Sequence, residues 1–295
     1  MTKERIGFIG TGIMGKPMAH NLLKARYSLI VHNRTKSKTQ QLLSEGASWA
    51  ESPANVANNS DIVITCLPDT PDVRQVFLGE SGVIEAAKPG LVCIDMSTIS
   101  PAATKEMGVT LAAKGVTLID APISGGEIGA IEAKLSIMMG GPKDAVEKVR
   151  PIMEVMGRAV TYCGPLGSGQ ITKLANQIMV IHTIMSIAEG FAFAEKAGLG
   201  LETTLKVTSA GAAGSHSLKA LGPKIIAGDF KPAFMVDLQQ KDLRLVIEYA
   251  EQLKQPLPGV ALARQLLAVL QAHGRGRDGT QAMVDVIRQL GNKPD

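Results

Sequence analysis

The chain has 295 residues, of which 45% are hydrophobic and only 3% aromatic, and its formal net charge is +4. This length and composition predict a large buried core, divided between about two globular domains. The net charge is small and no basic block is interleaved with aromatic residues, so the sequence does not indicate a nucleic-acid partner. Cys66, Cys93 and Cys163 lack the spacing of a zinc site or a disulfide framework, so we expect no metal and a reducing, cytoplasmic setting.

The segment Met1–Arg5 leads directly into a strand pattern, so we expect no signal or transit peptide. The most apolar long stretch, 174–193, contains polar side chains such as Asn176, Gln177 and Glu189. These groups favour a helix buried in a soluble core over a segment that spans a membrane.

Short apolar runs alternate with helical segments up to about Cys163, which predicts a mostly parallel sheet with helices on both faces. The expected strands are Leu29–Val31, Ile62–Cys66, Leu91–Asp95, Thr117–Asp120, Ile137–Gly140 and Val160–Cys163. The later segments are helical, at Ile171–Ala197, Leu201–Ser209, Met235–Gln255, Val260–His273 and Ala282–Leu290. We therefore expect an α/β Rossmann-type domain over residues 1–164 and an all-α domain over 165–295, with the active site between them.

A glycine-rich turn follows the first apolar run, Ile6–Ile9. In such a turn Gly10 permits the tight bend, Gly12 lets the backbone approach a pyrophosphate, and Gly15 lets the next helix pack on the strand. The helix start then offers N–H groups to the phosphates. The pattern predicts a dinucleotide site made of Gly10, Thr11, Gly12, Ile13, Met14 and Gly15.

The second strand leads into Asn33-Arg34-Thr35, where an NAD-binding chain usually carries an acidic residue for the ribose hydroxyl. Arg34 and Thr35, with lysines nearby, suit a 2′-phosphate instead, so NADP is favoured over NAD. The alternative is that Arg34 is an ordinary solvated arginine.

Polar or turn-forming residues also follow later strands. Leu67, Pro68 and Thr98 are expected near the nicotinamide, because open α/β sheets bind ligands at the carboxyl ends of their strands. Ser124-Gly125-Gly126 combines a hydroxyl with two glycine N–H groups, which suits a carboxylate, although such a triplet also occurs as a plain turn.

A glycine turn, Gly167-Ser168-Gly169, leads into the longest helical segment, which carries Lys173, Asn176 and Gln177. Their spacing places the three side chains on one face of the helix. The positive end of the helix dipole and burial both lower the pKa of a lysine in that position, which makes Lys173 a candidate proton donor. The alternative is a lysine whose ammonium group reaches solvent.

Four stretches of this sequence resemble the signatures of the β-hydroxyacid dehydrogenase family, and they occur in the same order along nearly the whole chain: Gly10–Ala19, Asp120–Gly126, Gly167–Lys173 and Lys241–Leu243. Within that family, the tartronate semialdehyde reductases are the most similar at Lys173–Gln177, Glu127, Ala213–Ser215 and Phe230–Pro232. The resemblance implies NAD(P)-dependent reduction of a short-chain semialdehyde acid to the hydroxy acid. 3-Hydroxyisobutyrate dehydrogenase and glyoxylate or succinic semialdehyde reductases are the alternatives within the family.

The same resemblance implies roles for individual residues. Lys173 would be the general acid, and the triplet Ser124, Gly125 and Gly126 would hold the substrate carboxylate. Asn176 and Gln177 would orient the substrate, and either of them could take the amide role. Lys241 would close on the cofactor from the helical domain. A homodimer or homotetramer is expected, because the apolar content of the segment Ile171–Ala197 exceeds what one small helical domain covers.

Two rivals use the same scaffold, namely a non-catalytic interaction module and an imine reductase. In both, the lysine at position 173 is typically replaced, so its presence here speaks against them. A third rival, 6-phosphogluconate oxidation, would need a longer chain and a cluster of arginines for the sugar phosphate, and we find neither in this sequence.

Overall fold

A computed structural model describes residues 4–291 of the chain. These residues form two compact units, the first ending at Lys173 and the second beginning at Leu174. The change from one unit to the other falls inside helix α9 (Ser168–Lys196), not at the glycine turn before it. The expected tail at Lys293–Asp295 lies outside the described residues.

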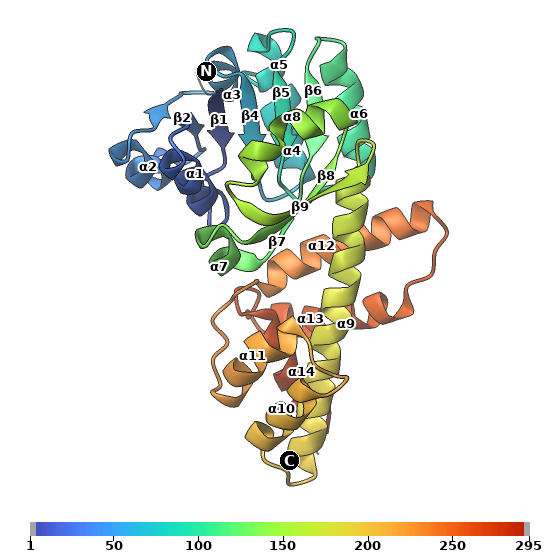
Figure 1. The fold of residues 1–295 in the computed structure, drawn as a ribbon. Helices are drawn as coiled ribbons and strands as arrows, with labels where there is room; N and C mark the ends of the chain where they lie inside the picture. Colours follow the sequence, from blue (N-terminus) through green and yellow to red (C-terminus); the bar gives the residue numbers. More distant parts are fainter. Residues whose placement is uncertain (1–3, 292–295) are drawn as a thin grey trace. The chain divides into compact units, whose positions relative to one another are not determined.

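The first unit contains a nine-stranded sheet in the order β3-β2-β1-β4-β5-β6-β8-β7, with β9 paired to β8 (Figure 1). Strands β1 to β6 are parallel, β8 runs antiparallel to β6, and β9 runs parallel to β8. The strand order reverses between β1 and β4, and open sheets of this kind bind ligands at such a point. The strands are β1 Arg5–Ile9, β2 Ser28–His32, β3 Ser48–Trp49, β4 Ile62–Thr65, β5 Val92–Asp95, β6 Thr117–Asp120, β7 Ile123–Ser124, β8 Leu135–Gly140 and β9 Gly157–Gly164.

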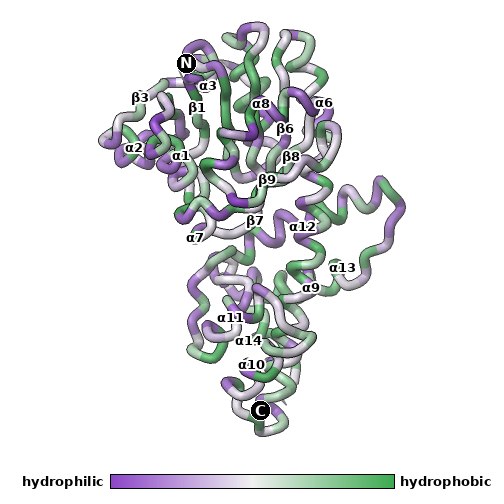
Figure 2. The backbone as a smooth tube through the Cα atoms, in the orientation of Figure 1, coloured by the Kyte–Doolittle hydropathy of each residue, from purple (hydrophilic) through white to green (hydrophobic). Residues whose placement is uncertain are grey.

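Helices cover both faces of this sheet. Successive side chains of a strand point to opposite faces, so neighbouring residues of one strand pack in two separate cores. On β1, Phe8 packs with residues of α1 and α8, whereas Ile9 packs with residues of α3, α4 and α6. Figure 2 shows the central strands as hydrophobic stretches. The doubly wound architecture is therefore confirmed. The helices of this unit are α1 Gly15–Lys24, η1 Lys36–Thr39, α2 Gln40–Ser44, α3 Pro53–Asn58, α4 Thr70–Leu78, α5 Val83–Ala86, α6 Pro101–Ala112, α7 Gly126–Ile131 and α8 Lys143–Met153.

The second unit is helical and has its own core, in which Leu174, Ile181 and Phe191 of α9 pack against the later helices. Helix α9 is long and apolar enough to cross a membrane by length and composition alone, and 39% of its most apolar window is buried in the protein. No other helix of residues 4–291 passes that test. The remaining helices are α10 Leu201–Ala210, α11 His216–Ile226, α12 Val236–Gln252, α13 Pro258–Ala272, η2 Thr280–Ala282 and α14 Met283–Gly291.

Candidate active site

The three glycines of the first turn have three different geometric requirements. Gly10 has a φ of +97°, which side chains disfavour. A Cβ on Gly15 would lie 1.8 Å from the Gly10 carbonyl oxygen, so helix α1 packs directly on the turn. A Cβ on Gly12 would meet nothing within 4 Å. The backbone at Gly12 therefore borders open space, as a pyrophosphate-binding turn requires.

Asn33, at the end of β2, holds the glycine turn in place. Its side-chain oxygen accepts the Thr11 N–H at 3.1 Å, and its amide group donates to the Thr35 carbonyl at 2.9 Å. The buried Thr11 hydroxyl has no hydrogen-bond partner within residues 4–291. An unpartnered hydroxyl beside the open face of Gly12 fits a phosphate ligand, so the residues present are suited to a dinucleotide.

Arg34 extends into solvent from the loop after β2, with 89% of its side chain exposed. Its nearest anion is Asp72 of α4, at 3.7 Å. A separation of that size at the surface contributes little to stability, so the guanidinium is available to a ligand. The neighbouring Lys36 lies over the Trp49 ring, 4.9 Å from its centroid.

A buried hydrogen-bond network joins the loops that follow β4 and β5. The Ser97 hydroxyl donates to Asp95 Oδ1 at 2.6 Å and accepts the Leu67 N–H at 2.8 Å. Thr65 also donates to Asp95 Oδ1, at 2.8 Å. The segments that carry Leu67 and Thr98, both expected near the nicotinamide, are thus fixed to each other by side chains that point into the protein.

The Ser124-Gly125-Gly126 segment forms the link from β7 to α7. Gly125 and Gly126 have φ values of +136° and +64°, and both lie in the region that favours glycine. A Cβ on Gly125 would approach Leu135 to 3.2 Å. The shape of this turn thus depends on the two glycines. Ser124 pairs with Ser136 of β8, which fixes its place at the edge of the sheet.

Lys173 is the sixth residue of α9 and is 7% exposed. The helix begins at Ser168, three residues earlier than the apolar pattern predicts. The reason is that the carboxylate of Asp120, which is distant in sequence, accepts the N–H groups of Gly167 and Gln170. A buried ammonium group three residues beyond Gln170 could donate a proton to a substrate oxygen.

In the second unit, Asn176 and Gln177 form one chain of hydrogen bonds with Asp242. The Asn176 amide donates to Gln177 Oε1 at 2.9 Å, and Gln177 Nε2 donates to Asp242 Oδ2 at 2.6 Å. The Lys241 ammonium lies 2.6 Å from Asp242 Oδ1. Asp242 therefore fixes the orientation of the Gln177 amide, a role that the sequence alone does not indicate.

Asp120, the last residue of β6, is fully buried, and it accepts the N–H groups of Gly167 and Gln170 at 2.7 Å each. Burial raises the pKa of its carboxyl group to about 6, and the nearby Asp95 adds to the rise, while the two backbone N–H groups oppose it. The sequence predicts Asp120 as the last residue of a strand and the first residue of a family signature, and it assigns the side chain no role. Its burial and its distant partners become visible only in the fold.

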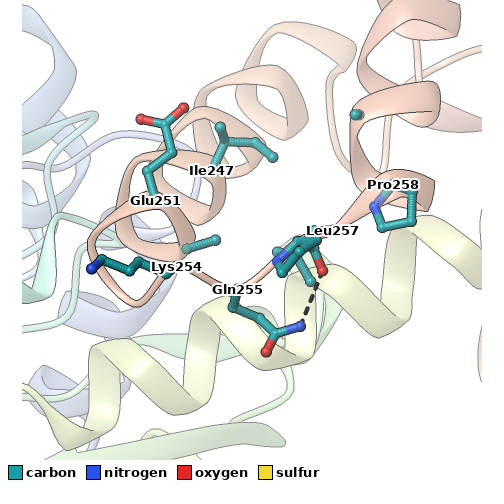
Figure 3. Close-up of a pocket in the computed structure, with 9 residues that line it drawn as sticks. Ile247, Glu251, Lys254, Gln255, Leu257 and Pro258 are labelled. Atoms are coloured by element: carbon teal, nitrogen blue, oxygen red, sulfur yellow. Dashed lines mark hydrogen bonds between the residues drawn. The ribbon is translucent and has the colours of Figure 1, made fainter.

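Three further features lie apart from these residues. His182 hydrogen-bonds to the Ile178 carbonyl at 2.7 Å, one turn earlier in α9. No group of three or more potential metal ligands occurs within residues 4–291. A shallow hollow of about 480 Å³ lies at the turn from α12 to α13, between Ile247 and Leu257 (Figure 3). It contains none of the expected site residues.

We expect Gly12→Ala and Gly15→Ala to differ in their effects. The added methyl group of Gly15→Ala would lie 1.8 Å from the Gly10 carbonyl oxygen, so this variant should have a lower melting temperature and weaker NADPH binding. The added methyl group of Gly12→Ala would meet no protein atom within 4 Å, so this variant should keep its melting temperature and lose only NADPH affinity. Thermal unfolding and fluorescence titration with NADPH measure both. A Gly12→Ala variant that binds NADPH as tightly as the parent would contradict a pyrophosphate above that residue.

The raised pKa of Asp120 predicts a pH dependence of stability. Between about pH 4 and pH 6 the unfolded chain loses the Asp120 proton and the folded chain keeps it, so this group lowers the free energy of unfolding as pH rises. The loss is complete above pH 6 and amounts to about 3 kcal/mol. The free energy of unfolding of the parent and of Asp120→Asn is measured by denaturation at each pH, and the difference between the two isolates the contribution of Asp120. A difference that does not change between pH 4 and pH 7 would refute the shift.

Two family models match successive parts of the chain. One, described as the NAD binding domain of 6-phosphogluconate dehydrogenase, matches residues 5–164. The other, described as the NAD-binding domain of NADP-dependent 3-hydroxyisobutyrate dehydrogenase, matches residues 167–287. The chain belongs to the 3-hydroxyisobutyrate dehydrogenase family. It is an NAD(P)-dependent hydroxyacid dehydrogenase, and the recognition from sequence signatures is confirmed.

The relatives of this dehydrogenase carry several different substrate names. The chain is 39% identical to 2-hydroxy-3-oxopropionate reductase of Escherichia coli, covering 98% of each protein. It is 37% identical to 2-(hydroxymethyl)glutarate dehydrogenase of Eubacterium barkeri, covering 97% of this chain and 95% of that protein. The structure of Mycobacterium tuberculosis 3-hydroxyisobutyrate dehydrogenase with L-serine superposes with a TM-score of 0.89, at 29% identity and 97% and 99% coverage.

Proposed function

We propose that this dehydrogenase reduces 2-hydroxy-3-oxopropionate to glycerate, with NADPH preferred over NADH. The observation that carries the proposal is Lys173, a buried lysine early in α9, within one helical turn of Asn176 and Gln177. The similarity of the motifs around it to tartronate semialdehyde reductases supports this substrate. The 39% identity to the Escherichia coli reductase supports the same choice.

In this proposal each residue has one task. Ser124 and the N–H groups of Gly125 and Gly126 bind the substrate carboxylate, and Asn176 orients the substrate through its amide. Lys173 donates a proton to the aldehyde oxygen as negative charge develops there. NADPH, when bound, supplies the hydride to the aldehyde carbon. In the reverse direction, neutral Lys173 accepts the proton from the hydroxyl group.

A substrate panel tests the proposal. NADPH oxidation is followed with 2-hydroxy-3-oxopropionate, glyoxylate, succinic semialdehyde and methylmalonate semialdehyde, and kcat/KM is compared. We expect the first to have the highest value. A higher value for methylmalonate semialdehyde would identify a 3-hydroxyisobutyrate dehydrogenase instead, and a higher value for glyoxylate or succinic semialdehyde would identify a reductase of those substrates.

We also propose that the enzyme is a homodimer or homotetramer. Large apolar side chains are exposed on the helices of the second unit, among them Met179 at 65%, Phe193 at 76% and Val207 at 66%. Such a set of exposed apolar groups is typical of a surface that binds another copy. Light scattering at micromolar concentration should therefore give a multiple of the chain mass, and Phe193→Glu should reduce that mass. A monomeric mass for the parent protein would contradict the proposal.

A further inference from the structure

Helix α9 begins on a carboxylate that comes from a distant strand. Asp120 Oδ1 accepts the N–H of Gly167 and Asp120 Oδ2 accepts the N–H of Gln170, each at 2.7 Å. The N–H groups at the start of a helix have no partner within the helix, and a capping side chain usually comes from the residue just before it. Here β6 supplies the cap, which attaches the helix start to the carboxyl end of a central strand.

Gln170 forms a second attachment in the same turn of helix. Its side chain is fully buried, its oxygen accepts the Ile99 N–H at 3.1 Å, and its amide group donates to the Ser97 carbonyl at 2.8 Å. Ser97 also accepts the Leu67 N–H. The helix start is therefore bonded to the loop after β5, and through Ser97 to the loop after β4.

Close packing leaves the Asp120 carboxylate little room to move. A Cβ on Gly140 would lie 2.4 Å from Oδ1, and a Cβ on Gly169 would lie 2.8 Å from Oδ2. The backbones of β8 and α9 thus approach the carboxylate as closely as glycine permits. Two charged groups lie nearby, namely Asp95, in register with Asp120 on β5, and Lys105, whose side-chain carbons border Gly167.

We propose that Asp120 and Gln170 are positioning residues for Lys173. Together they set the place and direction of the first turn of α9, and so the place of the ammonium group three residues beyond Gln170. The inference rests on the proposed role of Lys173 as proton donor. Asp120 also contributes a negative charge at the start of the helix that carries Lys173, which favours the protonated form of that lysine.

Two variants separate the geometric effect from the charge effect. Asp120→Asn removes the charge and places an amide group against two N–H donors, whereas Gln170→Met removes only the neutral attachment. Both should lower kcat by about 10- to 100-fold, because a displacement of about 1 Å has effects of this order. NADPH affinity should remain close to that of the parent. Only Asp120→Asn should move the alkaline limb of the kcat profile to lower pH, since only that variant removes negative charge.

The same two substitutions in a Lys173→Ala background complete the test. If Asp120 and Gln170 act through Lys173, neither substitution should lower the remaining turnover further. The proposal is overturned if the losses multiply in that background, if kcat is unchanged in the single variants, or if NADPH affinity accounts for the loss. If Asp120→Asn does not fold, Gln170→Met in the same cycle decides. Near-parental turnover of Lys173→Ala alone would instead refute the proposed role of Lys173.

Discussion

Turnover should fall by about 10²- to 10⁴-fold when Lys173 is replaced by alanine, because proton transfer to the aldehyde oxygen loses its donor. NADPH binding should be preserved, since the glycine turn and Asn33 lie elsewhere on the first unit. Lys173→Arg should also fail, because a guanidinium stays protonated and its planar group does not reproduce the ammonium position. Turnover against pH and NADPH affinity are measured separately for both variants.

Lys196→Ala is the matched control for this experiment. Lys196 is the last residue of the same helix, and its ammonium group donates to the Gly291 carbonyl at 3.4 Å. The control should keep parental turnover. If Lys173→Ala did the same, another group would have to donate the proton, and Lys241 would be the next candidate to examine.

The second large effect is expected on the choice of cofactor. Arg34→Asp should raise KM for NADPH by about 10- to 100-fold and change KM for NADH far less, because a charge-assisted contact with the 2′-phosphate is lost. Arg74→Asp makes the same change of charge on an exposed arginine that is paired with Glu106 at 2.7 Å. It should not discriminate between the two cofactors. Equal losses with both cofactors in Arg34→Asp would exclude a phosphate contact.

Local patterns predicted most of the strands and helices. The apolar runs predict β4, β5, β6 and β8 to within two residues, because strands that are buried on both faces are nearly continuous apolar segments. Strands β3 and β7 were missed, since two residues each are too short for a pattern. Helix α11 was missed as well, because Gly222 and Pro223 interrupt its sequence, while the Ser215 cap that starts it is visible only in the structure.

The candidate site was predictable where its chemistry lies in contiguous residues. The glycine turn, the Ser124–Gly126 segment and the face of α9 that carries Lys173 are of that kind. The contacts of Asp120 with Gly167 and Gln170 span 47 and 50 residues, and that of Gln170 with Ser97 spans 73. No local pattern encodes such pairings, because they depend on the order of strands in the sheet.

The capping of α9 by Asp120 determines where the first unit can be separated from the rest of the chain. A fragment that ends at Gly164, where the strand pattern stops, would contain the buried Asp120 carboxylate without either of its N–H donors. It would also lack Leu166, which packs against Gly108 of α6. Leaving a buried carboxylate without donors is costly, so such a fragment should be prone to unfold and aggregate. A cofactor-binding fragment for calorimetry or NMR should therefore extend past Lys173 and include enough of α9 to keep its first turns helical.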